Sequence, residues 1–589
     1  MKSLRKKLTA IVSSAFETAG FSPTFGGVEV SNRPDLGQFQ CNGALPAAKE
    51  YKKNPREIGQ SILDILIEKD EFSEVSLAGP GFINLKLTDE YLSEHMREVV
   101  TDERLGCSVA EDPLKIIIDY GGANIAKPLH VGHLRAAIIG ECLKRLARFL
   151  GHDVTGDVHL GDWGLQMGMV ISELQRREPN LPYFDSAFSG SYPKESPVTP
   201  QDLEEIYPAA SALAKSDEAA KEAARLATFE LQEGRKGYRA LWQHIFDVSV
   251  DDLKTDYSKL NIEFDLWLGE SHTQDRIPAL IEKLKADGWA KESRGALVIN
   301  VAREDDNKDI PPLMLLKSDG AVVYGTTDLA TIEQRVEDYN PDLVLYVVDK
   351  RQSDHFVQVF RGAYKSGTAP ESLKLEHLGF GTMNGKDGSP FKTREGGVMK
   401  LKDLIAMVAG KARERMEEAE IGKEYSDEEK DDVARMIGVA TLKYADLMNQ
   451  PTKDYVFDLD RFSSFDGRTG PYLLYTSVRI KSILRKAEER GFHPGRLHLP
   501  TSDVERQLML KISELPEVLA LGFENRLPNY LCEYVYNLGV HFNRFYHEHH
   551  ILREEDKAKR DAWLTLSQMT LSTLVLVIDL LGIEVPERM

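Results

Sequence analysis

Two histidines, His130 and His133, stand where a short apolar run gives way to an amphipathic segment. The run Ile116–Ile118 is typical of a strand buried on both faces. From Leu134 onward, apolar residues recur with helical spacing. A helix N-terminus offers free N–H groups and a positive dipole end, which suit phosphate. Gly132 would let a nucleotide approach the backbone closely. The pattern therefore predicts a nucleotide site.

Two other interpretations of His130 and His133 are that they cap the helix or bind a metal ion. A lone pair of histidines at this spacing is more often structural than functional. No cysteine cluster and no HExxH sequence accompanies this pair, so a metal site is the weaker interpretation. The strand, the glycine and the apolar helix together favour a nucleotide.

Two aspartates follow strand-like segments. Asp119 ends the apolar run, and Asp328 follows the segment Val322–Tyr324. In sheets covered by helices on both faces, ligands bind beyond the carboxyl ends of the strands. Two carboxylates there could bind a cation, and a guanidinium matches a carboxylate in bidentate fashion. Helix capping by Asp328, or a Mg²⁺ site, explains the spacing equally well.

A glycine-rich stretch, Gly385–Gly397, carries Lys386, Lys392 and Arg394. Cationic loops of this kind suit leaving phosphates. The stretch is not a Walker A loop, because its glycine spacing is wrong and Asp387 stands where Ser or Thr is needed. A solvated basic loop is the simpler explanation from composition alone.

The bulk properties limit the class of protein. The chain has 589 residues, 42% of them hydrophobic and 29% charged, with a net charge of −20. This length predicts three or four domains. The net charge argues against non-specific nucleic-acid binding by the whole surface, although a local basic face stays possible. The sequence contains no run of about 18 apolar residues, so no transmembrane helix is expected. Four scattered cysteines indicate reduced thiols in a cytosolic protein.

The elements that must position these residues fall into four predicted domains. Residues 1–112 are predicted to form an α/β accessory domain. Residues 113–400 alternate strands and helices, as in a Rossmann-like doubly wound parallel sheet. Polar helical sequence without apolar strands predicts an insertion at about 171–300. A helical segment, 401–455, leads to a predicted all-α bundle at 456–589. The second half of the sheet is predicted from Leu313–Leu316, Val322–Tyr324, Leu343–Val348 and Leu375–Gly379.

The predicted bundle mixes aromatic and basic residues near its start. Tyr472 and Tyr475 precede Arg479 and Lys481 on one amphipathic segment. Such a surface can stack bases and contact phosphates. On the pattern alone, a helix with a charged outer face is the better explanation.

The sequence resembles the arginyl-tRNA synthetases, of the class I aminoacyl-tRNA synthetases, over essentially the whole chain. Asn124–Arg135 contains the family's form of the HIGH signature, and His159–Gln166 is a second match. Tyr324–Asp328 with Gln352 is a third, and Gly470–Tyr475 resembles the start of the anticodon-binding domain. The resemblance implies ATP-dependent activation of L-arginine to arginyl-adenylate and transfer to the terminal adenosine of tRNA(Arg).

The resemblance also implies binding residues for each substrate, and it implies no tightly bound metal or organic cofactor. Residues 1–112 would contact the outer corner of the tRNA. The protein is expected to be a cytoplasmic monomer that takes ATP with Mg²⁺. The implied residues are Asp119, Asn124, Tyr324, Asp328 and Gln352 for arginine; His130, Gly132, His133, Lys127, Lys392 and Arg394 for ATP; and Asn84, Tyr472 and Tyr475 for tRNA.

The sequence departs from the family pattern in two places. The usual Lys-Met-Ser-Lys loop is absent, and Phe391–Arg394 stands in its place. Lys127, just upstream of the histidines, is a plausible substitute, so the catalytic candidates are His130, His133, Lys127 and Lys392. Relatives often carry Ser or Pro at Gly121–Ala123, where extra glycine could loosen the loop.

Two other functions compete with this interpretation. A nucleotidyltransferase could use the same HxGH site to adenylylate a small metabolite, but it would have no need of a long helical C-terminal domain. A non-catalytic RNA-binding paralogue would not need His130, His133, Asp119 and Asp328 intact.

Overall fold

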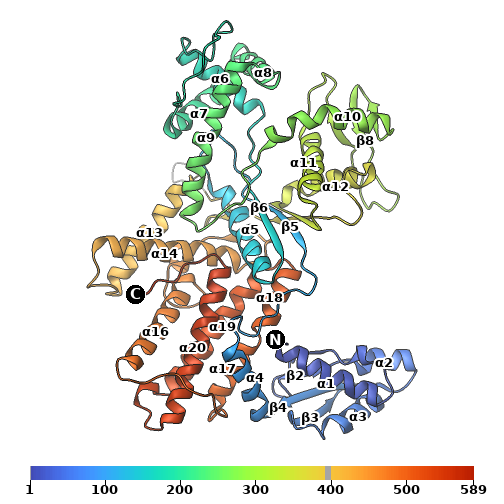
Figure 1. Ribbon diagram of the computed structural model, residues 1–589, viewed down its shortest axis with the longest axis vertical. Helices are drawn as coiled ribbons and strands as arrows, with labels where there is room; N and C mark the ends of the chain where they lie inside the picture. The colour runs from blue at the N-terminus through green and yellow to red at the C-terminus, as the bar shows by residue number, and fades with distance from the viewer. Residues whose placement is uncertain (1, 392–398) are drawn as a thin grey trace. The chain divides into compact units, whose positions relative to one another are not determined.

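The computed structural model describes residues 2–391 and 399–589 (Figure 1). The chain divides into two compact units, which are described separately. Unit 1 comprises residues 1–110, 465–579 and 585–589, and unit 2 comprises residues 111–464 and 580–584. Unit 1 thus combines most of the first and last predicted domains.

Unit 2 is built on a four-stranded parallel sheet of order β11-β10-β5-β6. Helix α5 (Val131–Phe149) connects β5 to β6 on one side, whereas β10 and β11 lie on the other side of β5. The strand order therefore reverses between β5 and β10, where sheets of this type bind ligands. This confirms the predicted Rossmann-like architecture. The strands are β5 (Lys115–Asp119), β6 (Asp153–Asp157), β10 (Leu343–Asp349) and β11 (Lys374–Phe380).

Close packing holds α5 against the sheet. Leu134, Ile138 and Leu146 are buried on its inner face. Gly140 lies over the ring of Tyr120, and a Cβ at this position would be 2.2 Å from the Tyr120 Cγ. The helix therefore approaches the strand end that carries Asp119 as closely as a backbone can.

Two of the predicted strands of this sheet were wrong. Leu313–Leu316 is a strand, β9, but it pairs antiparallel with β8 (Ala296–Ile299) in a separate sheet of order β7-β8-β9. Val322–Tyr324 is not a strand, because Val322 makes only an isolated bridge to Leu316 and α11 begins at Tyr324. Strands β7 (Ala290–Ser293) and β8 also contradict the expectation of no strands in this stretch. Apolar runs favour strands but do not specify their partners.

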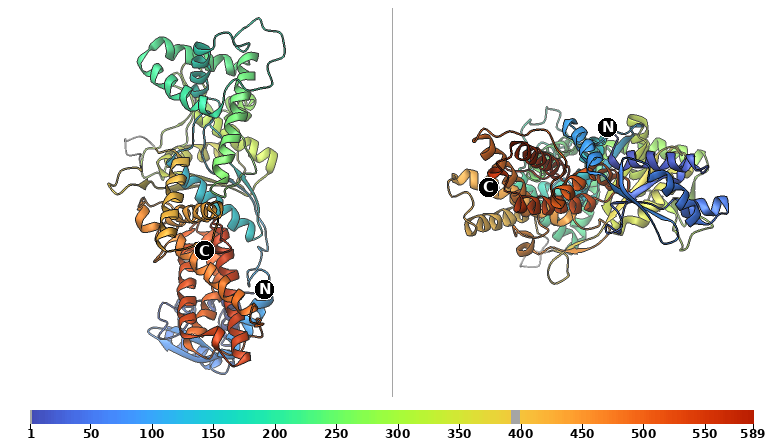
Figure 2. Two further views of the ribbon diagram at one scale, coloured as in Figure 1. Left: turned by 90° about the vertical axis from the view of Figure 1, so that its left-hand side faces the viewer. Right: turned by 90° about the horizontal axis from the view of Figure 1, so that it is seen from below.

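Three helices of the predicted insertion, drawn in green in Figure 2, pack together in unit 2 with α6 (Leu165–Arg177). They are α7 (Pro200–Ser216), α8 (Glu218–Gln232) and α9 (Lys236–Ser258). Helices α7 and α8 are separated at Asp217, whose side chain accepts from the Ala219 amide and caps α8. The other helices of unit 2 include α10 (Ile277–Ala286), α11 (Tyr324–Tyr339), α12 (Ser353–Ser366), α13 (Leu401–Glu418), α14 (Asp427–Leu447) and α15 (Leu459–Phe462).

Unit 1 contains an antiparallel sheet of order β1-β2-β4-β3 and a bundle of long helices, in orange and red in Figure 2. The predicted C-terminal all-α bundle is observed. The sheet and its helices are α1 (Leu4–Thr18), β1 (Val28–Val30), β2 (Phe39–Cys41), α2 (Ala44–Tyr51), α3 (Pro55–Leu66), β3 (Phe72–Ala78), β4 (Phe82–Leu87) and α4 (Asp89–Thr101). The bundle contains α16 (Gly470–Glu488), α17 (Asp503–Ser513), α18 (Leu515–Glu524), α19 (Asn529–Glu548) and α20 (Lys557–Leu580).

Among the described residues, one helix, α20, is long and apolar enough to cross a membrane by length and composition. Its most apolar window has a mean hydropathy of 1.4, and 67% of that window is buried within the protein. A core helix of a folded bundle meets the same criteria, and the burial of Leu564, Leu566 and Val577 fits that role.

Candidate functional site

The His130–His133 segment caps α5 with its own side chains. The Gly132 amide donates to His130 Nδ1, and the His130 amide donates to His133 Nδ1, each over 3.1 Å. Because each Nδ1 accepts, the proton of each neutral ring lies on Nε2. Burial lowers the pKa of His133 to about 3 and also lowers the pKa of His130. Both side chains are therefore neutral N–H donors at pH 7.

A cavity of about 190 Å³ opens beside these histidines. It lies at the switch point, since its lining joins the start of α5 to the residues that follow β10 and β11. Gly132 is exposed there, and a Cβ on it would lie 2.8 Å from His130 Cε1. The lining residues are His130, Val131, Gly132, Arg135, Asp349, Arg351, Phe380, Gly381, Thr382, Met383, Pro390 and Phe391. Lys392 and Arg394, predicted to bind ATP, lie outside the described residues.

The arginine-site prediction assumed that the Asp119 carboxylate is free to bind a substrate guanidinium. In the structure this carboxylate is already paired with a side chain of the protein. Arg335 Nη2, from α11, donates to Asp119 Oδ2 and to Asp157 Oδ2, each over 2.7 Å. All three side chains are buried. One guanidinium between two carboxylates leaves the group with a formal charge of −1. Asp119 is therefore part of a buried group with a net negative charge. The guanidinium that it contacts is that of Arg335 and not that of a substrate.

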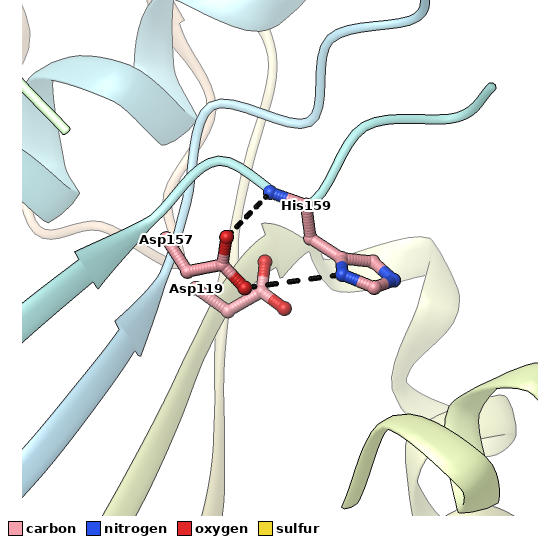
Figure 3. Close-up of side chains that lie close together, drawn as sticks. All are labelled: Asp119, Asp157 and His159. Carbon is pink, nitrogen blue, oxygen red and sulfur yellow. Dashed lines mark hydrogen bonds and ion pairs between the residues drawn. The ribbon is translucent and has the colours of Figure 1, made fainter. Parts of the chain in front are cut away.

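Asp119 and Asp157, together with His159, are also the residues that could hold a Mg²⁺ ion. Asp119, Asp157 and His159 have ligand atoms within 4.8 Å of one another (Figure 3). Arg335 already supplies a cation to both carboxylates. Burial works to lower the pKa of Arg335, but the carboxylates hold it well above its usual range. Arg335 thus offsets the charge of one of the two carboxylates in this cluster.

Asp328 has a different partner. His355 Nε2 lies 2.5 Å from Asp328 Oδ2, and this hydrogen bond raises the pKa of His355. Tyr324 lies one helical turn before Asp328 on α11 and is 71% exposed. Gln352, at the end of a short 3₁₀ helix (Lys350–Gln352), is also exposed. The structure thus brings Tyr324 and Asp328 together on one helix face.

Glu270 was missed by the sequence analysis. Its amide donates to the Leu160 carbonyl over 3.1 Å, which places it beside the His159–Gln166 match. Burial raises the pKa of its carboxyl to about 7, with Asp162 and Asp328 adding to the shift and His159 opposing it. Its charge also acts on Tyr324. No motif marks Glu270, because it lies in the stretch interpreted as a helical insertion.

The loop after β5 uses its glycines for backbone angles and close approaches. Gly121 and Gly122 have φ of +95° and +61°, which favour glycine. A Cβ on Gly121 would lie 2.9 Å from the ring of Phe264. Asn124 pairs with Gly161 in an isolated parallel bridge. These contacts bring Asn124 next to the His159–Gln166 segment.

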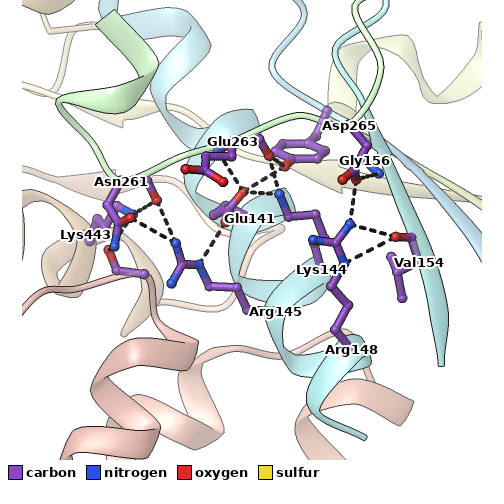
Figure 4. Close-up of polar contacts among 12 residues, drawn as sticks. Glu141, Lys144, Arg145, Arg148, Val154, Gly156, Asn261, Glu263, Asp265 and Lys443 are labelled. Carbon is purple, nitrogen blue, oxygen red and sulfur yellow. Dashed lines mark hydrogen bonds and ion pairs between the residues drawn. The ribbon is translucent and has the colours of Figure 1, made fainter. Parts of the chain in front are cut away.

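A buried ionic network supports α5 from beneath (Figure 4). Glu141 pairs with Lys144 over 2.9 Å and with Arg145 over 2.8 Å. Lys443, from α14, donates to the Gly582 carbonyl over 2.7 Å. Burial lowers the pKa of Lys443 to about 7. Arg145 Nη2 also donates to the Asn261 carbonyl over 3.2 Å, and the Tyr120 hydroxyl donates to Glu141 Oε2 over 2.8 Å. These two contacts join α5, which carries His133, to residues outside the helix, and breaking such a buried network costs several kcal/mol.

The predicted tRNA-contacting residues of unit 1 differ in exposure. Tyr475 is 44% exposed. The Tyr472 hydroxyl accepts a hydrogen bond from Asn543 Nδ2 over 2.9 Å, and both residues line a cavity of about 540 Å³. Asn84 is 1% exposed, on β4, and its amide donates to the Phe82 carbonyl. Asn84 is therefore not presented on the surface, which contradicts its predicted contact with tRNA.

Three family models match the chain. Residues 95–459 match the catalytic domain of class I tRNA synthetases (R), and residues 473–589 match the DALR anticodon binding domain. Residues 2–87 match the arginyl tRNA synthetase N terminal domain.

Similar proteins match over their full length. A protein of Alkaliphilus oremlandii is 55% identical, and one of Agathobacter rectalis is 49% identical. In both cases 100% of each chain is covered, and both relatives are named arginine–tRNA ligase. Among solved structures, the arginyl-tRNA synthetase of Plasmodium falciparum matches with a TM-score of 0.81 at 26% identity over 100% of both chains. That of Thermus thermophilus shares the fold, with a TM-score of 0.79 at 23% identity over 100% of both chains.

Proposed function

The chain belongs to the class I arginyl-tRNA synthetases and is an arginine–tRNA ligase, and from this premise we propose how its residues divide the work between ATP and arginine. Its substrates are ATP, L-arginine and tRNA(Arg). The observation that carries the proposal is the position of two sites at one end of the parallel sheet. Neutral His130 lines the first, with neutral His133 stacked on its ring, and the second is marked by the carboxylates of Asp328 and Glu270, whose charges act on each other.

ATP, with its Mg²⁺, occupies the cavity at His130 and His133. The arginine carboxylate attacks the α-phosphorus, the bond to the bridging oxygen of the β-phosphate breaks, and pyrophosphate leaves. The Nε2–H groups of His130 and His133 donate to phosphate oxygens as negative charge builds on them. Donors that are already oriented by backbone contacts lose little free energy to reorganisation during this step. Lys127 and the loop with Lys392 and Arg394 supply positive charge.

Arginine binds between the start of α11 and Glu270. Asp328 and Glu270 accept from its guanidinium, and Tyr324 covers it. The buried −1 group around Asp119 adds attraction for the cation without contacting it directly. Asn124 and Gln352 hold the α-amino and carboxylate ends, so that the carboxylate faces the α-phosphorus.

The second step needs tRNA. The 2′-hydroxyl of the terminal adenosine attacks the carbonyl of arginyl-adenylate, and AMP leaves. Tyr472 and Tyr475 contact the anticodon end, where aromatic rings can stack on bases. Bound tRNA is also required for the first step. The enzyme works as a monomer in the cytoplasm.

Pyrophosphate exchange tests this function. Purified protein should exchange labelled pyrophosphate into ATP only when both arginine and tRNA(Arg) are present. Exchange without tRNA would favour an HxGH nucleotidyltransferase that acts on a small metabolite. Tight tRNA binding without any charging would favour a non-catalytic RNA-binding protein.

Replacement of Lys127 by alanine should lower kcat by about 10²–10³-fold, the effect of losing one transition-state donor. The arginine KM should change little, since Lys127 does not contact the arginine site. Single-turnover adenylate formation measures the effect. A loss of kcat seen with Lys392→Ala but not with Lys127→Ala would move this role to the 391–394 loop.

The affinity for arginine should fall as the pH drops below about 7. The Glu270 carboxyl has a raised pKa of about 7, so below that pH it takes up a proton and loses its attraction for the guanidinium. Since kcat/KM reports the free enzyme, kcat/KM for arginine should rise with pH through about 7. The Glu270→Gln variant should give a lower and flatter profile. An unchanged profile in that variant would remove Glu270 from the site.

A further inference from the structure

The insertion helix α7 contacts the residues at the start of α13. Glu204 on α7 accepts from Lys400 Nζ over 2.7 Å and from Lys402 Nζ over 2.6 Å. Burial would raise the pKa of the Glu204 carboxyl, but the two lysines outweigh it and lower that pKa. Glu204 is therefore a carboxylate clamped between two ammonium groups at the first turn of α13.

The clamped segment lies against the histidine motif. The Val131 amide donates to the Met399 carbonyl over 3.1 Å, and the Leu401 amide donates to the Leu129 carbonyl over 2.8 Å. His130 and Lys400 face each other in the resulting antiparallel bridge. Any shift of Lys400 thus moves the backbone from which His130 projects.

The same helix also holds Lys127. Tyr207 lies one turn after Glu204, and Lys127 Nζ lies 4.3 Å from the centre of its ring, within cation–π range. The backbone next to Lys127 is held as well, since the Ala126 amide donates to Ser249 Oγ over 2.9 Å and Ala126 has a φ of +57°. Lys127 is close enough to lower the pKa of both His130 and His133.

We propose that Glu204 and Tyr207 are positioning residues for adenylate formation: one face of α7 sets the place of Lys127 and of the backbone beside His130. The insertion then takes part in adenylate formation by positioning residues that act on the phosphates of ATP. Neither residue contacts a substrate. This inference rests on the proposed role of His130 and Lys127 in ATP chemistry.

The clamp differs from a single surface ion pair because one largely covered carboxylate holds two lysines. The Glu204 side chain is 19% exposed, and its two lysines are about 40% exposed. Exposed pairs on the neighbouring helix are looser, as between Glu218 and Lys221 at 3.1 Å, where the Glu218 side chain is 75% exposed. A displacement of about 1 Å at a reacting group can cost about 10²-fold in rate, so a modest shift of this backbone has a measurable effect.

The test compares pre-steady-state adenylate formation in matched variants. Glu204→Gln and Tyr207→Leu should each lower the rate constant about tenfold or more, with the arginine KM within about twofold of wild type. Tyr207→Phe keeps the aromatic face and should restore the wild-type rate. Glu218→Gln, the control on α8, should change nothing.

A double-mutant cycle with Lys400→Gln separates positioning from general damage. If Glu204 acts through Lys400, the double variant should be no slower than the slower single variant. Wild-type rates in Glu204→Gln and Tyr207→Leu would overturn the inference, as would a rate loss explained entirely by a lower fraction of folded enzyme. If wild-type protein itself forms no adenylate with arginine and tRNA, the proposed function fails instead.

Discussion

Asp328→Ala should raise the arginine KM by about 30- to 150-fold, or about 2–3 kcal/mol. The guanidinium would lose a charged partner on a half-buried carboxylate, and a hydrogen bond to a charged group contributes about 1.5–3 kcal/mol. kcat should change much less, because the contact is present in both the ground state and the transition state. Steady-state exchange kinetics at varied arginine concentration measure the effect.

Two controls decide what Asp328 does. Asp328 pairs with His355, so it could act by placing that ring. In that case His355→Gln would raise the arginine KM as much as Asp328→Ala does. Asp354→Ala removes an exposed carboxylate on the same helix as His355, paired with Lys308, and should leave the KM unchanged. An unchanged KM in Asp328→Ala would exclude Asp328 from the arginine site.

Arg335→Met should destabilise unit 2 by about 3–5 kcal/mol, the cost of leaving buried charges without their partner. Asp119 and Asp157 would then face each other in a buried site. Four of the five tryptophans, at positions 163, 242, 267 and 289, lie in unit 2. Urea unfolding followed by tryptophan fluorescence therefore reports mainly on this unit.

The stability of the Arg335→Met variant should depend on pH. Without Arg335, the folded-state pKa of Asp119 should lie above its unfolded value, because burial already raises the pKa of this carboxyl. A raised folded pKa disfavours folding as the pH rises through it. The stability deficit should thus be largest near neutral pH and shrink in acid. Arg361→Met, which breaks the more exposed pair with Asp306, should cost less.

A triple variant separates stability from substrate binding. Arg335→Met combined with Asp119→Asn and Asp157→Asn removes all three charges and should recover much of the lost stability. It should not recover arginine activation, because the −1 group is gone. Full activity in the triple variant would show that this group only supports the fold.

The sequence by itself predicted the features that depend on local order along the chain. The strand ending at Asp119, the helix beginning at His130–His133 and the parallel sheet were confirmed, since a buried run, a glycine and helical spacing are short-range signals. The family resemblance was likewise confirmed by full-length relatives. The capping of α5 by its own histidines also uses residues only two and three positions apart.

Only the tertiary structure decided which charges meet. Arg335 lies 216 residues from Asp119, and Glu204 lies 196 residues from Lys400. An apolar pattern states that β9 is a strand but not that its partner is β8, and no pattern marks Glu270. Ion pairing and strand pairing depend on which chemically similar groups the fold brings within a few ångströms, and the sequence offers many equivalent partners. The fold therefore had to show that Asp119 pairs with Arg335, that Asn84 is buried, and that Glu204 on α7 pairs with Lys400.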